Sequence, residues 1–73
     1  MDLQERVADE LAKVVLELSE TLNDPGIVDE VKKVVGTSST TLEEAFLTAV
    51  RVRRAERRAY ELLDRVRKEN GLD

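Results

Sequence analysis

An uninterrupted pattern of apolar residues runs through the first third of the chain. Steps of three and four residues separate Leu3, Val7, Leu11, Val14, Leu18 and Leu22. Such steps place side chains on one face of an α-helix, whereas a half-buried strand alternates at every second residue. Ala8, Ala12 and Val15 widen this face. The pattern predicts a helix near residues 2–22.

A turn and a shorter apolar segment follow. Residues 23–26 read "NDPG", in which proline fixes φ and glycine permits a positive φ. Asp24 can cap the next helix, with Pro25 at its first position. The segment then spaces its apolar side chains by three and four, at Ile27, Val28, Val31, Val34 and Val35. We predict a helix near 26–35 that ends at Gly36, although the preference of valine for strands leaves a strand over 28–35 open.

The third segment predicts a long helix near residues 41–69. Thr41 with Glu44, or Thr40 with Glu43, forms a capping box at its start, and Gly71 can cap its end. Its apolar pattern steps by three and four, and we name the following positions the heptad stripe: Leu42, Ala45, Ala49, Val52, Glu56, Ala59, Leu63 and Val66. This spacing favours left-handed, near-antiparallel helix packing.

Together these segments predict an all-α chain, a small three-helix bundle of long, short and long helices in a single domain over residues 1–73. A core of this size supplies only about 3–5 kcal/mol, and the chain has no Cys for disulfides. We therefore expect self-association. At 1.5 Å per residue the third helix is ~42 Å long and the first ~32 Å, so the third should overhang by most of two turns. Leu62, Leu63 and Val66 fall on this overhang and are predicted to meet a second copy in a homodimer or higher oligomer.

The composition argues against catalysis. The chain has no His and no Cys, which removes the usual ligands of zinc and haem and the usual base of a catalytic triad. The hydroxyl groups at residues 37–41 have no neighbouring base and suit helix capping. We expect no catalytic residue, no metal site and no enzymatic activity.

Charge is distributed unevenly along the chain. Residues 1–31 hold nine acidic side chains against Arg6 and Lys13, whereas "RVRRAERR" at 51–58 holds five arginines against Glu56. Opposite charges on the two halves attract each other within one chain or between antiparallel copies. Four arginines lie opposite the heptad stripe and are candidates for contact with nucleic acid or an acidic partner: Arg51, Arg54, Arg57 and Arg58.

Glu56 is the one charged residue within the heptad stripe. A carboxylate at such a position either specifies a partner or pairs with a neighbouring arginine, Arg53 or Arg57. We include Glu56 among the candidate interaction residues.

The chain shows no targeting or membrane signal. Residues 1–4 lead directly into a charged amphipathic pattern, so we expect no signal peptide. No apolar run approaches the ~20 residues that span a bilayer. We expect a cytoplasmic protein without membrane contact.

From residue 28 to residue 50 the chain resembles the opening segment of the dodecins, small flavin-storing oligomers. "VVGTSSTTLEEA" is similar to that family's strand-end glycine, Thr-Ser turn and Glu-Glu-Ala helix start. The resemblance implies a strand over 28–35 and a hollow oligomeric shell. Leu42 stands where that family has its flavin-stacking tryptophan, so we expect no flavin and no other cofactor.

From residue 24 to residue 58 the chain also resembles the ribbon-helix-helix antitoxins of the VapB type. "DP" at 24–25 and "TLEEAFLTAVRVR" at 41–53 are similar to that family's helix start and arginine-bearing second helix. The resemblance implies a strand at 16–22, a dimer whose paired strands enter the major groove of DNA, and a toxin partner.

We predict a small non-enzymatic helical module for protein–protein interaction that acts through its amphipathic third helix as a homo-oligomer. The first alternative is a DNA-binding antitoxin or repressor of the ribbon-helix-helix type. The second is a designed helical bundle with no natural function, which the few aromatic residues and clear caps fit.

Overall fold

Residues 1–72, which the computed structural model describes, form three α-helices and contain no strand. They are α1 (Leu3–Thr21), α2 (Gly26–Ser38) and α3 (Thr40–Glu69). The predicted all-α fold of long, short and long helices is confirmed. The strand over 28–35 and the strand over 16–22 are wrong, because these residues belong to α2 and to the end of α1. The sheet-containing arrangements implied by the two family resemblances are therefore not formed.

Two acidic side chains form the N-terminal cap of α1. The Asp2 carboxylate accepts a hydrogen bond from the Glu5 N–H at 2.8 Å, and the Glu5 carboxylate accepts one from the Asp2 N–H at 3.4 Å. This reciprocal pair is a capping box with aspartate in place of serine or threonine. It holds the start of α1 at Leu3.

The turn between α1 and α2 is built on Asn23 and Asp24. Asn23 has a positive φ of 51°, which asparagine tolerates better than most residues. The sequence suggested a positive φ at Gly26, but the residue in this turn that has one is Asn23. The Asp24 carboxylate accepts a hydrogen bond from the first N–H of α2, that of Gly26, at 3.0 Å. Pro25, expected at the first helical position, is the N-cap residue, because α2 begins at Gly26.

The predicted end of the second helix at Gly36 is wrong, because α2 continues to Ser38. Gly36 lies inside α2, beside the carboxylate end of the Glu43 side chain. A Cβ atom at this position would lie 2.5 Å from Oε2 of Glu43 on α3. The missing side chain of Gly36 thus leaves room for the carboxylate of Glu43 where α2 turns into α3.

Ser39 alone joins α2 to α3. Its backbone is extended, with φ −158° and ψ 110°, and its hydroxyl oxygen accepts a hydrogen bond from the Leu42 N–H at 3.0 Å. The predicted capping boxes at Thr40 and Thr41 are wrong because both threonines already lie inside α3. Once α2 extends to Ser38, Ser39 is the one residue with the non-helical backbone that an N-cap needs.

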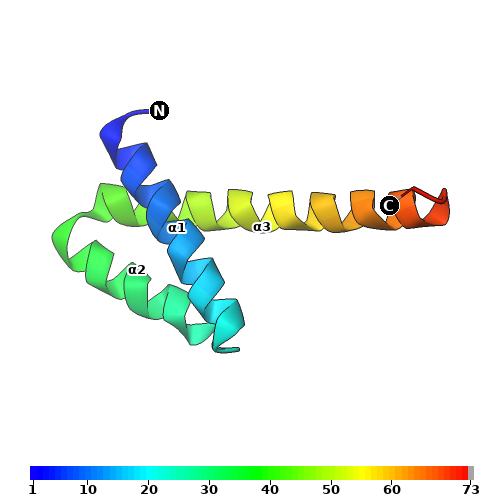
Figure 1. Cartoon of the computed structure of the whole chain (residues 1–73). Helices are drawn as coiled ribbons and strands as arrows, with labels where there is room; N and C mark the ends of the chain where they lie inside the picture. The colour runs from blue at the N-terminus through cyan, green and yellow to red at the C-terminus, as the bar shows by residue number, and fades with distance from the viewer. Residues whose placement is uncertain (73) are drawn as a thin grey trace.

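The core lies where α1 crosses the first half of α3, with α2 packed beside both (Figure 1). Seven apolar residues are buried in it: Ala8, Ala12, Val15, Leu16, Val28, Phe46 and Val50. Phe46 is the largest of these and is fully buried. On α1 the buried face is centred on Ala8 and Ala12, so the row of larger side chains beside them stays partly in solvent.

The molecule is elongated. Its principal extents are 50, 29 and 13 Å, and its radius of gyration is 14.9 Å, whereas a compact chain of this length has a radius of about 11 Å. The C-terminal half of α3 accounts for the difference, since it projects beyond α1 and α2 (Figure 1). α1 crosses α3 obliquely in the same view, so the near-antiparallel packing predicted from the heptad stripe is wrong for this pair.

Candidate interaction surface

The last part of α3 stands clear of the other helices. Arg57 is the last α3 residue with an ion pair to α1, in which its guanidinium contacts the carboxylate of Glu20. We call residues 58–69, which follow it, the arm. The arm is roughly twelve residues or ~18 Å long, and all of its residues are exposed. The predicted overhang of most of two turns is too short, because α1 crosses α3 rather than running along it.

An apolar face lies along the arm. Leu62, Leu63 and Val66 keep 51%, 48% and 45% of their surface exposed. At about 100° per residue, Leu62 and Val66 each lie about 160° around α3 from Phe46. Leu62 and Val66 are therefore turned away from the core side of α3, whereas Leu63 lies five turns after Ala45, on the edge of the core side. All three are exposed and open to another molecule.

The end of the arm is closed by the predicted glycine cap. Gly71 has a positive φ of 69°. The Leu72 N–H donates to the Arg67 carbonyl at 2.8 Å and the Gly71 N–H donates to the Lys68 carbonyl at 3.3 Å. This pair of bonds is a Schellman motif. Arg67 and Lys68 also place positive charge at the C-terminal end of the helix, where it is favourable.

The heptad stripe serves the core only in its first part. Leu42, Ala45 and Ala49 are half-buried against the core, but the stripe is exposed from Val52 onward. Oε1 of Glu56 lies 3.7 Å from Nη1 of Arg53, and the Glu56 side chain is half exposed. Glu56 therefore lies beside Arg53, and it is not part of the apolar face of the arm.

Arg53 forms the principal polar contact between α1 and α3. Its Nε donates to Oδ1 of Asp9 at 2.9 Å and its Nη2 to Oδ2 at 2.8 Å, a two-pronged pair. This hydrogen bonding lowers the pKa of the Asp9 carboxyl below its ordinary value and raises that of Arg53. Both side chains remain about one third exposed, so water screens the attraction. The pair joins α1 to α3 near their crossing and, being partly exposed, adds little stability.

Acid is expected to weaken the fold through Asp9. Because folding lowers the pKa of this carboxyl, the ionised group stabilises the fold above its ordinary pKa of 3.8 and loses that contribution as pH falls through the lower folded value. The Asp9→Asn variant has no carboxylate at this position and so lacks this stabilisation at every pH. The difference in free energy of unfolding between the two chains, measured by urea denaturation, should be largest near neutral pH and shrink in acid. A difference that does not change with pH would contradict this role of the pair.

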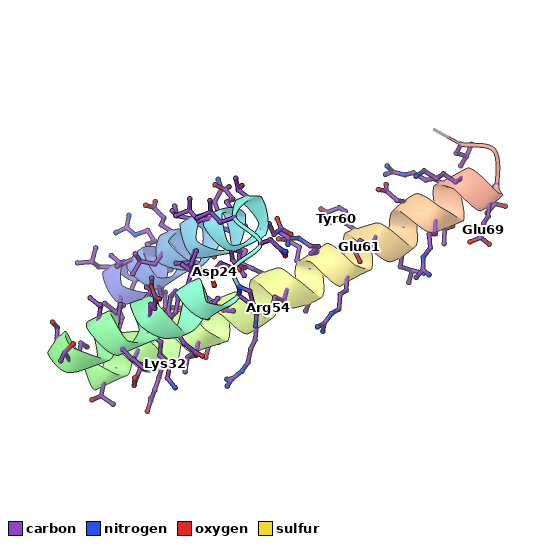
Figure 2. All side chains as sticks on the ribbon, turned by 90° about the horizontal axis from the view of Figure 1, so that it is seen from below. Asp24, Lys32, Arg54, Tyr60, Glu61 and Glu69 are labelled. Atoms are coloured by element: carbon purple, nitrogen blue, oxygen red, sulfur yellow. The ribbon has the colours of Figure 1, made fainter. Side chains whose placement is uncertain are left out.

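The predicted arginine cluster is divided in the structure. All four arginines are exposed, and Arg57 forms an ion pair with Glu20 of α1. In Figure 2 the Arg54 side chain points away from α1. Arg53 was not among the candidates in the sequence, although its position three residues after Val50 places it on the buried side of α3.

The helical spacing of Tyr60 from Phe46 and Leu63 predicts a core position with only the hydroxyl at the edge, and this prediction is wrong. It is 63% exposed, on the stretch of α3 beyond the end of α1 (Figure 2). Its ring borders a shallow hollow between α1 and α3 that Leu16, Arg53 and Arg57 also line. Tyr60 lies on the same side of α3 as Phe46, but α1 no longer runs close to α3 at that point.

Comparison with models of known protein families, with curated proteins and with solved structures gave no match. Within residues 1–72 no three His, Cys, Asp or Glu side chains gather in a way that could hold a metal ion. In the same part of the chain, none of the helices has the length and apolar character needed to cross a membrane.

Proposed function

We propose that this chain is a non-enzymatic helical module for protein–protein interaction that associates with itself through the arm of α3. The observation that carries the proposal is the exposed apolar face of the arm, formed by Leu62, Leu63 and Val66. A folded helix that projects into solvent with an apolar face and a closed C-terminal end has the form of a docking element.

The total surface of the chain supports the same proposal. A folded monomer of 8.3 kDa exposes about 4,600 Å². This chain exposes 5685 Å², roughly 1,100 Å² more than that expectation. A stable interface buries about 800 Å² on each partner. The excess surface is thus sufficient for one interface of ordinary size.

Energetics favour covering the arm. Fully burying a large apolar side chain stabilises a protein by about 1.5–3 kcal/mol, and three side chains of the arm are about half exposed. A chain of 73 residues has a small core, so this contribution is large relative to its total stability. A second copy of the chain can supply the cover symmetrically, as most homo-oligomers do.

Leu63→Arg is expected to convert a dimer into a monomer. The substitution places a charge within the apolar face of the arm, where burial in an interface would be costly. Sedimentation equilibrium at tens of micromolar protein should give a mass of two chains for the unsubstituted protein and the 8.3 kDa of one chain for the variant.

Glu61→Arg is the matched control for this experiment. It introduces the same side chain two residues earlier on the arm, about 160° around the helix from Leu63. It should leave the dimer intact. The proposal is wrong if the unsubstituted chain is itself a monomer at these concentrations while circular dichroism shows a folded helical protein.

A further inference from the structure

A second apolar surface lies on α1. Leu3, Val14 and Leu18 keep 70%, 52% and 46% of their surface exposed, and Val7 lies between them, also exposed. Together with the half-buried Leu11 they repeat at steps of three and four along one side of α1, and we call this row the α1 stripe. The face of α1 that enters the core is the neighbouring one, so the stripe has no cover from α2 or α3 along most of its length.

The α1 stripe and the arm have the same layout. On α1, Glu10 and Glu17 are exposed, lie seven residues apart and each precedes a stripe leucine. On the arm, Arg58 and Arg65 are exposed and lie seven residues apart. Each precedes an apolar residue of the arm face, Ala59 or Val66. Seven-residue spacing places each pair along one flank of its stripe, in equivalent positions of a heptad.

We propose that the α1 stripe is the docking site for the arm of a second copy, which lies antiparallel on it, and that the two copies exchange arms reciprocally. This inference rests on the proposed self-association through the arm and names the surface that receives it. Each copy then offers one arm and one α1 stripe, so all four apolar surfaces of the pair are covered.

Flank charges select the antiparallel orientation. Each apolar stripe has a row of residues on either side, which we call its flanks. When two helices pack antiparallel, a flank faces the flank with the same heptad position on the partner. When they pack parallel, it faces the flank on the other side of the partner's stripe. Antiparallel packing brings Glu17 opposite Arg58 and Glu10 opposite Arg65. Parallel packing would place the two glutamates along the flank that holds Leu63, whose heptad-equivalent residues are Glu56 and Asn70, neither of them basic. The charges are complementary in one orientation only.

The same flank rule disfavours pairing of one arm with another arm. Two antiparallel arms would place Arg58 of one copy against Arg65 of the other, and like charges in such positions repel. The α1 stripe removes this conflict because glutamates, Glu10 and Glu17, occupy the corresponding positions. Charge complementarity therefore identifies α1, and not a second arm, as the surface that covers Leu62 and Val66.

The apolar residues also match in this register. When Val7 faces Val66 and Leu11 faces Leu62, Glu10 and Glu17 lie within two residues of the level of Arg65 and Arg58. The next two layers set Val14 against Ala59 and Leu18 against Ala55, so larger side chains on α1 meet smaller ones on α3. A two-fold axis relates the two contacts, because exchanging the copies exchanges arm and stripe.

Charge reversal tests the pairing directly. One variant carries Glu10→Arg and Glu17→Arg, and a second carries Arg58→Glu and Arg65→Glu. Either variant alone sets like charges against each other at both contacts of its dimer. Each should therefore dissociate about tenfold more readily, or more, than the unsubstituted chain in sedimentation equilibrium. An equimolar mixture of the two restores opposite charges at both contacts and should dimerise again, with one copy of each variant.

The control variant is Arg6→Glu with Lys13→Glu, which reverses two charges on α1 at the same spacing but further from the stripe. It should dimerise as the unsubstituted chain does. If both test variants dimerise normally while Leu63→Arg still dissociates the protein, the arm acts in self-association but does not dock on α1, and this inference is wrong. If the unsubstituted chain is a monomer, the proposed function and this inference both fail. Circular dichroism confirms that each variant is folded.

Discussion

Phe46→Ala is expected to unfold the chain. Phe46 is fully buried and is the largest side chain in a core of seven buried residues, four of which come from α1. Replacing a buried phenylalanine with alanine costs about 3–5 kcal/mol through lost burial and the cavity left behind. A core of this size supplies about 3–5 kcal/mol in total. Far-ultraviolet circular dichroism should show loss of most helix at micromolar concentration, where association contributes little.

The other aromatic residue provides the control. Tyr60 is largely exposed, so Tyr60→Ala should change the free energy of unfolding by no more than about 0.5 kcal/mol. Similar losses for Phe46→Ala and Tyr60→Ala in urea denaturation would contradict a core centred on Phe46.

Ala12→Leu is expected to destabilise the fold by about 1–3 kcal/mol, since it adds three carbon atoms to a well-packed core. Ala12 is fully buried and Ala8 almost so, where α1 crosses α3. Ala45 and Ala49 of α3 pack against the same core. The small side chains let the two helices approach closely, and a leucine would force them apart. The midpoint of thermal unfolding should fall by several degrees or more.

Lys13→Leu separates this effect from a general response to leucine in α1. Lys13 is exposed beside Ala12, and leucine favours helix about as well as lysine. The free energy of unfolding should therefore change by no more than about 0.5 kcal/mol. Equal stability of the Ala12→Leu variant and the unsubstituted chain would show that the crossing has room that the structure does not indicate.

The candidate interaction surface was partly predictable. The overhang of the third helix follows from its length, and Leu62, Leu63 and Val66 follow from spacing along it, so the sequence identified the apolar face of the arm. It did not identify the α1 stripe as exposed, because Leu3 and Val14 have the side chains and spacing of core residues. Which of two adjacent apolar faces of a helix is buried depends on the angle at which its neighbour crosses.

The capping residues show a similar division. Gly71 acts as predicted and Asp24 bonds the first N–H of α2, because each lies beside a turn whose position the local sequence determines. Ser39 was missed because Gly36 was expected to end α2, and each of the threonines that follow had a glutamate at capping-box spacing. The chain continues α2 through Gly36, where packing of α2 on α3 outweighs the helix propensity of one glycine, about 1 kcal/mol.

The sequence by itself determined the number and order of the helices and the extended length of the third. Apolar spacing, turn residues and caps act over a few residues, and their physical effects do not require the rest of the fold. Only the tertiary structure decided that α1 crosses α3 obliquely, that Arg53 meets Asp9, and that Tyr60 and the α1 stripe remain in solvent. These features depend on how closely α1 and α3 approach each other. The small alanines at the crossing allow a close approach. Only this approach brings together side chains that are far apart in the sequence.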